Sequence, residues 1–368
     1  MKIMYMLPSL SSGGVEQVVL ELCEGLTPLG VECVVVSAGG GMVTQVERHG
    51  ARHITRPVGK KSPATLWQVM STVRLLKKEK PDILHLHSRV PAWVGILACK
   101  LLRRPQRPVV LTTFHGFYSV NAYSAIMTKA QRIIAVSHCI HDHILKAYPG
   151  VPPERVCTIP NTIDTSEHNP DFHPTDEWLA TWRSEHPELA GKYVLCLPGR
   201  ITRGKGVHHL PAILTALKAR GVPAHVLLAG ETKRGKEAFR NELVNAFAQA
   251  GLSEDVTWLG LRRDVREIIY VSDVVISTSL QPEAGPKGTL EALALGRPLA
   301  GYAHGGVGEQ LKIFLPEGMI PVGDTEAMAE RLAEWRHCPP TLKRPIGEPY
   351  RRQDMIRAHF ALYKELLA

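Results

Sequence analysis

Short apolar runs alternate with amphipathic segments along the first part of the chain. Runs rich in Val, Ile and Leu, bounded by Gly or Pro, predict β-strands at 3–7, 32–37, 83–87, 109–113 and 132–136. Between them, apolar residues recur at helical spacing and predict helices at 15–29, 63–79, 92–102 and 141–148. Short apolar strands separated by helices indicate a parallel sheet that is covered by helices on both faces.

The same alternation returns in the second part of the chain. It weakens at about 160–190, where prolines stand among polar residues, and then predicts strands at 193–198, 224–229, 256–259, 274–277, 298–301 and 319–321. The pattern therefore predicts an α/β protein with two doubly wound, Rossmann-like halves. The expected division is an N-terminal domain at 1–170 and a C-terminal domain at 171–349, and ligands of such sheets bind outside the carboxyl ends of the strands.

Composition narrows the class of protein. Of the 368 residues, 44% are hydrophobic and 21% are charged, which is ordinary for a soluble globular protein. No uncharged apolar run approaches the roughly 20 residues that span a bilayer, and the first residues are too short an apolar run for a secretory signal. The seven cysteines are scattered without CxxC spacing. Reduced thiols and a cytoplasmic location are therefore expected.

The net charge of +9, with basic clusters at 77–80, 103–107 and 262–263, bears on which partners the protein binds. Basic faces attract nucleic acid, anionic lipid or phosphorylated ligands, although any single cluster is more often a solvated surface. No zinc finger, basic zipper or aromatic-interleaved RNA motif is present, so nucleic acid is not expected. Histidines 138, 141 and 143 fit no standard zinc spacing and no cysteine pair supports them, so no metal is expected.

Two glutamates eight positions apart are the most informative feature of the chain. Glu283 stands at the mouth of a loop rich in Gly and Pro that opens a helix, and Glu291 follows about two turns in. The start of a helix offers N–H groups to an anion, whereas a carboxylate accepts hydrogen bonds from hydroxyls. A nucleotide sugar carries both phosphates and hydroxyls and would satisfy both halves of this feature.

Two turns that follow predicted strands are rich in glycine. Gly13 and Gly14 come after the first strand, and Arg200 and Lys205 lie in a glycine-rich loop after the strand at 193–198. A fork-shaped donor and a point charge together suit a pyrophosphate. Neither turn has the GxGxxG or Walker spacing, which argues against a dinucleotide site and against ATPase chemistry.

One histidine stands out among 17. His115 follows the buried-looking strand at 109–113, and the carboxyl end of a parallel strand is where active sites form. His85 and His87 alternate on one strand face and are expected to be packed instead.

Taken together, these motifs resemble the family 4 retaining glycosyltransferases. The resemblance covers nearly the whole chain, and its elements, which include the segments at 115–116, 159–164 and 199–206, occur in the right order. It implies a GT-B fold, in which two doubly wound Rossmann-like domains face each other across a cleft and a C-terminal helix at 350–368 returns to the first domain. It also implies a metal-independent hexosyltransferase without a cofactor, whose donor is a nucleoside-diphosphate sugar, UDP-linked by family frequency.

The resemblance implies roles for the charged candidates. Arg200 and Lys205 would hold the donor diphosphate and offset the charge that builds as it leaves. Glu283 would orient the hexose and Glu291 would take the ribose hydroxyls, while His115 would lie at the reacting centre. Attack on the same face as the departing phosphate is the usual assignment in this family, so no enzymic nucleophile is required.

Further donor contacts are implied at the glycines and at the base. Gly14, Gly285 and Gly288, with Lys287, would lie against the sugar and the phosphates, and Leu261 belongs to the segment where the family holds the base. The chain departs from the family pattern after Glu283, where Ala-Gly-Pro replaces the common Gly-Phe-Gly or Gly-Phe-Pro. The missing Phe removes one wall of the sugar pocket. A second departure is a Thr at 162, where Gly is common.

The acceptor is expected to be a membrane-held glycan. Segments 114–124 and 305–310 look like those of proteobacterial enzymes that build cell-envelope saccharides, including the lipopolysaccharide core. A phosphate-bearing acceptor and peripheral contact with the anionic inner membrane agree with the positive charge.

Three other classes compete with the transferase. One is a nucleotide-sugar-binding protein that has lost turnover, since the loop after Glu283 is altered. Another is a nicotinamide-dependent oxidoreductase or epimerase, which predicts a GxGxxG turn that is missing here. A membrane scaffold leaves Arg200, Lys205, Glu283 and Glu291 unexplained.

Overall fold

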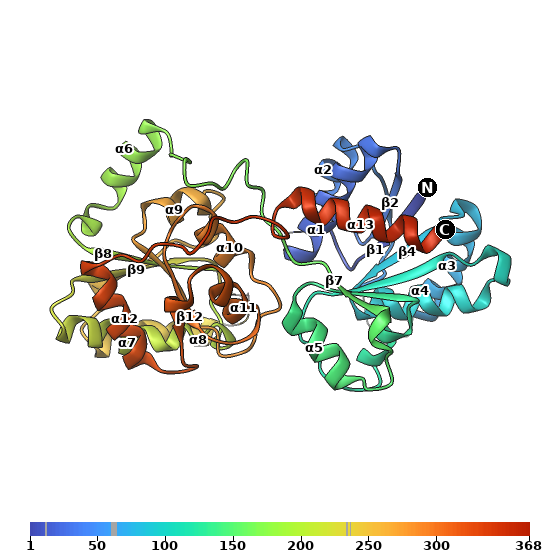
Figure 1. The fold of residues 1–368 in the computed structure, drawn as a ribbon. Coiled ribbons are helices and arrows are strands. Elements are labelled where there is room, and N and C mark those ends of the chain that lie inside the picture. The colour runs from blue at the N-terminus through green and yellow to red at the C-terminus, as the bar shows by residue number, and fades with distance from the viewer. Residues whose placement is uncertain (12, 60–64, 233–234, 236) are drawn as a thin grey trace. The chain divides into compact units, whose positions relative to one another are not determined.

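The computed structural model describes residues 1–11, 13–59, 65–232, 235 and 237–368 (Figure 1). They form two compact units. Unit 1 is Met1–Thr162 with Glu348–Ala368, and unit 2 is Ile163–Gly347. The sequence predicted the domain boundaries after residue 170 and before residue 350, whereas the units divide after Thr162 and before Glu348.

Unit 1 is built on a sheet of seven strands in its described residues. They are β1 (Lys2–Met6), β2 (Glu32–Ser37), β3 (Arg52–Thr55), β4 (Ile83–His87), β5 (Val109–Phe114), β6 (Arg132–Ala135) and β7 (Val156–Thr158). The order is β3-β2-β1-β4-β5-β6-β7, and every neighbouring pair is parallel. The strand order reverses between β1 and β4, which is where ligands of such sheets bind.

Helices cover this sheet. They are α1 (Gly14–Leu26), α2 (Val43–Arg48), α3 (Thr65–Glu79), α4 (Arg89–Leu101), α5 (His138–Ala147) and α13 (Arg352–Leu367), with short 3-10 helices at Thr27–Leu29, Arg104–Gln106, Ser124–Lys129 and Pro153–Arg155. The central strands are buried on both faces, which explains their continuous apolar sequence.

The C-terminal helix α13 packs against α1 of unit 1, as the red ribbon shows (Figure 1). Met355 and Tyr363 are part of the core of the first sheet, and Arg352 forms an ion pair with Glu24 at 3.1 Å. Thr162, the residue that replaces a common glycine, is buried and its hydroxyl donates to the Met355 sulfur at 3.7 Å. The return of the C-terminal helix to the first domain is therefore confirmed.

Unit 2 has a second parallel sheet of six strands in its described residues. They are β8 (Tyr193–Pro198), β9 (Ala224–Ala229), β10 (Val256–Trp258), β11 (Val274–Ser277), β12 (Leu299–Tyr302) and β13 (Met319–Ile320), in the order β10-β9-β8-β11-β12-β13. The strand order reverses between β8 and β11.

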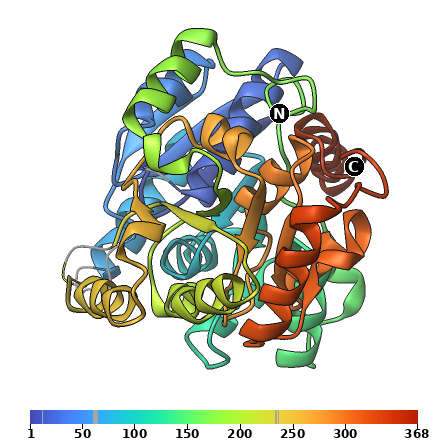
Figure 2. The same ribbon diagram turned by 90° about the vertical axis from the view of Figure 1, so that its left-hand side faces the viewer.

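The helices of unit 2 are α6 (Asp176–Glu185), α7 (Leu210–Ala219), α8 (Glu237–Gln249), α9 (Val265–Val271), α10 (Lys287–Ala294), α11 (Gly305–Phe314) and α12 (Thr325–His337). Short 3-10 helices lie at Pro187–Leu189, Arg203–Lys205, Val207–His209, Ser253–Asp255 and Pro316–Gly318. Figure 2 looks onto this unit, where the yellow-green α7 packs beside the orange-red α12.

The predicted fold class is confirmed, and the differences are local. The edge strands β3 and β7 and the helices α2 and α6 were not predicted. β3 is half exposed and β7 has three residues, so neither carries a long apolar run. α6 lies in the polar stretch and buries only Trp182, but Thr175 caps it by accepting from the Trp178 N–H.

The helices predicted at 92–102 and 141–148 both begin three residues earlier in the structure, the second at His138. The helix predicted at 92–102 begins at Arg89, because Pro91 lies in the first turn, where its missing N–H costs nothing. The helix predicted at 63–79 is seen from Thr65, and its first two residues lie outside the described residues. No helix in the described ranges is both long and apolar enough to cross a membrane.

Candidate functional site

The loops after β8 and β11 meet where the strand order of unit 2 reverses. After β8, the chain passes Gly199 and enters the short helix Arg203–Lys205, which ends at Gly206 with a φ of +64°. A Cβ at Gly206 would overlap the Thr278 carbonyl oxygen, so only glycine allows the two loops to approach this closely. The Thr278 hydroxyl also donates to the Lys205 carbonyl at 2.8 Å.

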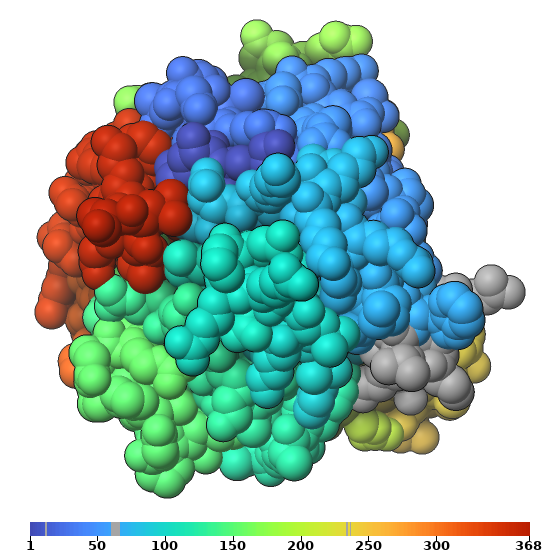
Figure 3. Space-filling model, turned by 90° about the vertical axis from the view of Figure 1, so that its right-hand side faces the viewer, coloured from blue at the N-terminus to red at the C-terminus, as the bar shows by residue number. Residues whose placement is uncertain are grey.

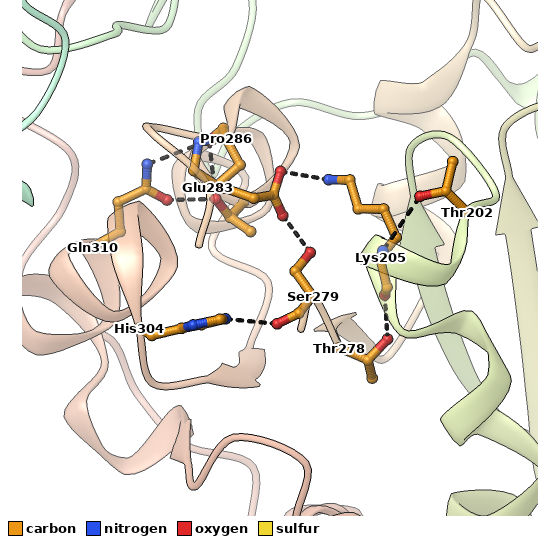
Figure 4. A network of polar contacts seen from close by, with 9 residues as sticks. Thr202, Lys205, Thr278, Ser279, Glu283, Pro286, His304 and Gln310 are labelled. Atoms are coloured by element: carbon orange, nitrogen blue, oxygen red, sulfur yellow. Dashed lines mark hydrogen bonds and ion pairs between the residues drawn. The ribbon is translucent and has the colours of Figure 1, made fainter. Parts of the chain in front are cut away.

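This approach brings Lys205 and Glu283 together (Figure 4). Lys205 Nζ lies 2.5 Å from Glu283 Oε2, and the Ser279 hydroxyl donates to Oε1 at 2.5 Å. Both charged side chains keep about a quarter of their surface exposed, 24% and 21%. The carboxylate is therefore oriented from two sides and still has acceptor capacity for a ligand hydroxyl.

The backbone of this loop is held by the start of α11. The Gly306 N–H donates to the Glu283 carbonyl at 2.6 Å, and a Cβ at Gly306 would lie 2.8 Å from Gly285 Cα. His304 Nε2 donates to the Ser279 carbonyl at 2.6 Å, which requires the proton on Nε2 (Figure 4). Sequence reasoning missed His304 and Ser279, although the Ser-Thr-Ser run that begins with the last residue of β11 was a signal of polar groups at a strand end.

Glu291 lies in the second turn of α10 and lines a hollow of about 630 Å³. The other lining residues are Glu167, His168, Arg263, Asp264, Val265, Arg266 and Glu267. Burial raises the pKa of the Glu291 carboxyl, while the nearby His168 and Lys287 act in the opposite direction. The four carboxylates at this hollow can accept from hydroxyls, and its two arginines can bind anionic groups.

The other predicted donor residues of unit 2 lie on the same loops. Leu261, 71% exposed, precedes Arg262, whose guanidinium forms two hydrogen bonds with Asp264 at 2.8 and 2.6 Å. Gly288 lies against Pro198 at the end of β8. Arg200 is exposed and, within the described residues, lies outside the network around Lys205.

His115 lies in unit 1, directly after β5. Its Nε2 is 2.8 Å from Nδ1 of His87, and the two rings stack with centroids 5.1 Å apart. Burial lowers the pKa of His115 to about 3, and the neighbouring His359 acts in the same direction. His115 is therefore a neutral imidazole at physiological pH.

His85 and His87 are packed, as predicted. Both are wholly buried, and His85 forms hydrogen bonds with the Tyr363 hydroxyl at 2.8 Å and the Thr113 hydroxyl at 2.7 Å. Gly14 is the first residue of α1, and a Cβ there would meet no heavy atom within 4 Å among the described residues. In the described part of the chain, no group of three or more His, Cys, Asp or Glu residues could hold a metal ion.

Comparison with known proteins decides the family. The model described as Glycosyltransferase Family 4 matches residues 12–167, and the model described as Glycosyl transferases group 1 matches residues 180–352. A solved glycosyltransferase from Rickettsia africae ESF-5 is 25% identical, with a TM-score of 0.85 over 100% of this chain and 98% of that chain. The chain belongs to the family 4 glycosyltransferases.

Other relatives of this family 4 glycosyltransferase differ in what they make. The alpha-maltose-1-phosphate synthase of Mycolicibacterium smegmatis is 28% identical over 70% of this chain and 69% of that protein. The Escherichia coli UDP-Gal:alpha-D-GlcNAc-diphosphoundecaprenol alpha-1,3-galactosyltransferase is 27% identical over 62% and 60%. The structure of WaaG, a glycosyltransferase involved in lipopolysaccharide biosynthesis, shares the fold, with a TM-score of 0.67 at 14% identity over 98% of this chain and 99% of that chain.

The predicted residues of this family 4 glycosyltransferase thus fall into two groups. Unit 2 brings Lys205 and Glu283 into direct contact and carries Glu291 on the helix that follows. Unit 1 carries His115 and Gly14 at the carboxyl edge of its own sheet. The roles assigned to these residues stay predictions.

Proposed function

We propose that this family 4 glycosyltransferase moves a hexose, with retention, from a UDP-linked sugar to a lipid-linked or lipopolysaccharide-core glycan. The observation that carries the proposal is the contact between Lys205 and Glu283 at the edge of the second sheet. A cation and an oriented carboxylate side by side suit a ligand that joins a diphosphate to a sugar.

The donor would bind along unit 2. Glu291 would accept the ribose hydroxyls at the 630 Å³ hollow, and the exposed face of Leu261 would contact the base. Lys205, with Arg200 on the same loop, would bind the diphosphate and stabilise the negative charge that it gains on leaving. The name of the Escherichia coli relative gives UDP-Gal as its donor, which supports a UDP-linked sugar here.

The transfer itself would need no enzymic nucleophile. The acceptor hydroxyl attacks the anomeric carbon on the face from which the diphosphate departs, and a phosphate oxygen takes its proton. Glu283 would hold the sugar hydroxyls in the orientation that this attack requires. His115, which is neutral, would contact the reacting groups by hydrogen bonding, and the cationic side chains would replace a metal ion at the diphosphate.

A face of unit 1 supports a membrane-held acceptor. On α3, Trp67 is 76% exposed and Met70 is 44% exposed, and the same helical stripe continues with exposed Arg74, Lys77 and Lys78. Figure 3 looks onto this face, where the light-blue α3 lies beside the cyan α4. An exposed aromatic residue next to cations suits the boundary between lipid headgroups and acyl chains.

Charge would strengthen this contact. The end of α4 adds an exposed Leu101, Arg103 and Arg104. Each Lys or Arg near an anionic leaflet is worth about 1 kcal/mol of binding. The name of the Escherichia coli relative gives a diphosphoundecaprenol-linked acceptor, a lipid-held glycan of this kind.

Assays with a panel of UDP-sugars test the reaction. Transfer to purified envelope glycans and release of UDP are measured for the native chain, for Glu283→Gln and for the control Glu330→Gln, which removes an exposed carboxylate of the same unit. We expect Glu283→Gln to lower kcat about a hundredfold with little change in UDP affinity, and the control to be active. Tight UDP binding without hydrolysis or transfer by the native chain would instead identify a binding protein.

Vesicle sedimentation tests the membrane contact. We expect the native chain to bind vesicles rich in phosphatidylglycerol and to leave neutral phosphatidylcholine vesicles in solution. Replacing Lys77 and Lys78 by Glu should abolish the binding, whereas the control replacement of Lys343 and Arg344 in unit 2 makes the same change of net charge elsewhere. Equal effects of the two pairs would show that only net charge matters.

A further inference from the structure

An arginine at the edge of the first sheet is held in an unusual setting. Arg89 is the first residue of α4 and follows β4, one of the two strands between which the strand order reverses. Ser88 turns the chain there with a φ of +97°, a left-handed value that is costly for a residue other than glycine. The turn aims the start of α4 at the carboxyl edge of the sheet.

The Arg89 side chain is enclosed by aromatic rings. Its guanidinium carbon lies 4.9 Å from the centroid of the Tyr118 ring and 5.4 Å from that of Tyr123. Tyr123 is supported in turn by Trp93, which stacks on it at 15° and donates from Nε1 to its carbonyl at 2.9 Å. The cation is therefore held in one place before any ligand arrives.

Only part of the guanidinium is used by the protein. Nη1 lies 3.4 Å from the Ser119 hydroxyl and 3.3 Å from the Ser124 hydroxyl, both long contacts. Within the described residues, no group accepts from Nε or Nη2 and no carboxylate pairs with Arg89. One edge of the fork, with three N–H donors, is left for another molecule.

The position of Arg89 at the start of α4 also favours an anionic partner. A cation at the first residue of a helix faces the positive end of the helix dipole, where an anion is the stabilising partner. Beside the guanidinium, Ser124 is wholly buried, whereas the exposed Ser119 hydroxyl can rotate to donate to a ligand. A planar carboxylate offers two oxygens, whereas a phosphate monoester offers three, which suits the N–H edge and the Ser119 hydroxyl together.

We propose that Arg89, with Ser119, binds a phosphate group carried by the acceptor glycan. The inference rests on the proposed function only in assigning the phosphate to the acceptor, since the anion site itself is a property of unit 1. Arg89 then selects phosphorylated acceptors and positions them at the edge where His115 lies.

Binding of inorganic phosphate tests the site without any transfer reaction. Phosphate is titrated by calorimetry into the full chain saturated with UDP, and acetate is the carboxylate comparison. We expect the native chain to bind phosphate more tightly than acetate, and Arg89→Gln to bind phosphate roughly tenfold to a hundredfold more weakly. Arg48→Gln, which removes an exposed arginine of the same unit, is the matched control and should bind as the native chain does.

Two further variants distinguish loss of the phosphate site from loss of the fold. Arg89→Lys keeps a cation between the rings but loses the fork, so weak phosphate binding with an unchanged melting temperature is expected. Ser119→Ala alters an exposed loop residue and should weaken binding only a few-fold. Equal phosphate binding by the native chain and Arg89→Gln, or tighter binding of acetate than of phosphate, would overturn the proposal.

A transfer assay assigns the phosphate to the acceptor. A lipopolysaccharide-core preparation and the same preparation after dephosphorylation are compared as acceptors. We expect the native chain to prefer the phosphorylated form by about tenfold or more in kcat/KM, and Arg89→Gln to lose the preference through a higher acceptor KM. Phosphate binding without any transfer would contradict the proposed function alone, and transfer without a preference would contradict the assignment to the acceptor.

Discussion

Lowering the pH from 7 to 5 is expected to destabilise unit 1 through three histidines that the fold buries side by side. His85 and His87 come from β4 and His359 from α13, and none is more than 2% exposed. The rings of His85 and His87 lie 4.2 Å apart, and those of His85 and His359 lie 6.0 Å apart. Tyr5 and Tyr363 are the neighbouring polar rings, and the Coulomb effects from nearby histidines oppose protonation.

Burial lowers the pKa of all three histidines, to about 4 for His359. The folded chain therefore keeps them neutral, while the unfolded chain takes up protons below a pKa of about 6.5. The stability that they contribute is fully present above that value and is lost as the pH falls toward the folded pKa. Each histidine that stays neutral lowers the free energy of unfolding by about 2 kcal/mol between pH 7 and pH 5, so these three lower it by about 6 kcal/mol. His115, whose pKa burial also lowers, adds to this loss in the native chain and in the variants alike.

Urea denaturation at the two pH values measures the loss of unfolding free energy. Hydrogen exchange of peptides from β4 and β5 reports on the stability of unit 1 separately. We expect His359→Gln to lose about 2 kcal/mol less than the native chain between pH 7 and pH 5, because one titrating group is gone. His337→Gln, at the exposed end of α12, is the control and should behave as the native chain. The same loss in His359→Gln as in the native chain would refute the reasoning.

Three other predictions concern the donor site. Because burial raises the pKa of Glu291, UDP affinity in calorimetry should begin to fall at a higher pH than for an exposed glutamate, and a persisting dependence in Glu291→Gln would contradict this. Gly306→Ala should lower kcat at least tenfold, about 1.4 kcal/mol, because its Cβ meets the loop of Glu283, whereas Gly41→Ala, where nothing lies within 4 Å, is the control. Ser279→Ala should lower kcat about fivefold with UDP affinity unchanged, since it removes one hydrogen bond of about 1 kcal/mol, and a wild-type kcat would exclude a role in orienting the carboxylate.

The fold was predictable because its signals are local. Strands such as β8 and β11 are buried on both faces, so their sequence is a continuous apolar run between turn residues. α6 carries no such signal, because it exposes most of its surface and buries one tryptophan. Its cap at Thr175 was visible in the sequence, but a capping residue followed by polar positions does not outweigh nearby prolines.

The site was predictable as separate motifs and not as contacts. Lys205 and Glu283 were placed on loops that follow strands, where parallel sheets bind ligands. That their side chains touch depends on Gly206, which lets two segments more than 70 residues apart approach at backbone distance. His304 reaches the same loop from the start of another helix, and no spacing in the sequence relates it to Ser279.

In the first sheet, too, the sequence predicted the position of single residues but not the contact between them. His115 was correctly expected at the end of a strand, and His87 was correctly expected to be packed. The two were nevertheless treated as unrelated, although parallel pairing of β4 with β5 brings their ends together and the rings share a hydrogen bond. Strand order, which decides such neighbours, follows from packing across the whole sheet and not from either segment alone.

The contact between Lys205 and Glu283 changes how the donor clamp is understood. The two had been assigned to different parts of the ligand, the diphosphate and the sugar. A lysine ammonium has three donors, so Lys205 can keep its contact with Glu283 while a phosphate oxygen takes another. The diphosphate and the carboxylate that orients the sugar would then share one cation. In the proposed reaction, the negative charge that builds on the departing diphosphate is stabilised by the same ammonium that holds Glu283 in place. Departure of the leaving group is therefore coupled to the orientation of the sugar.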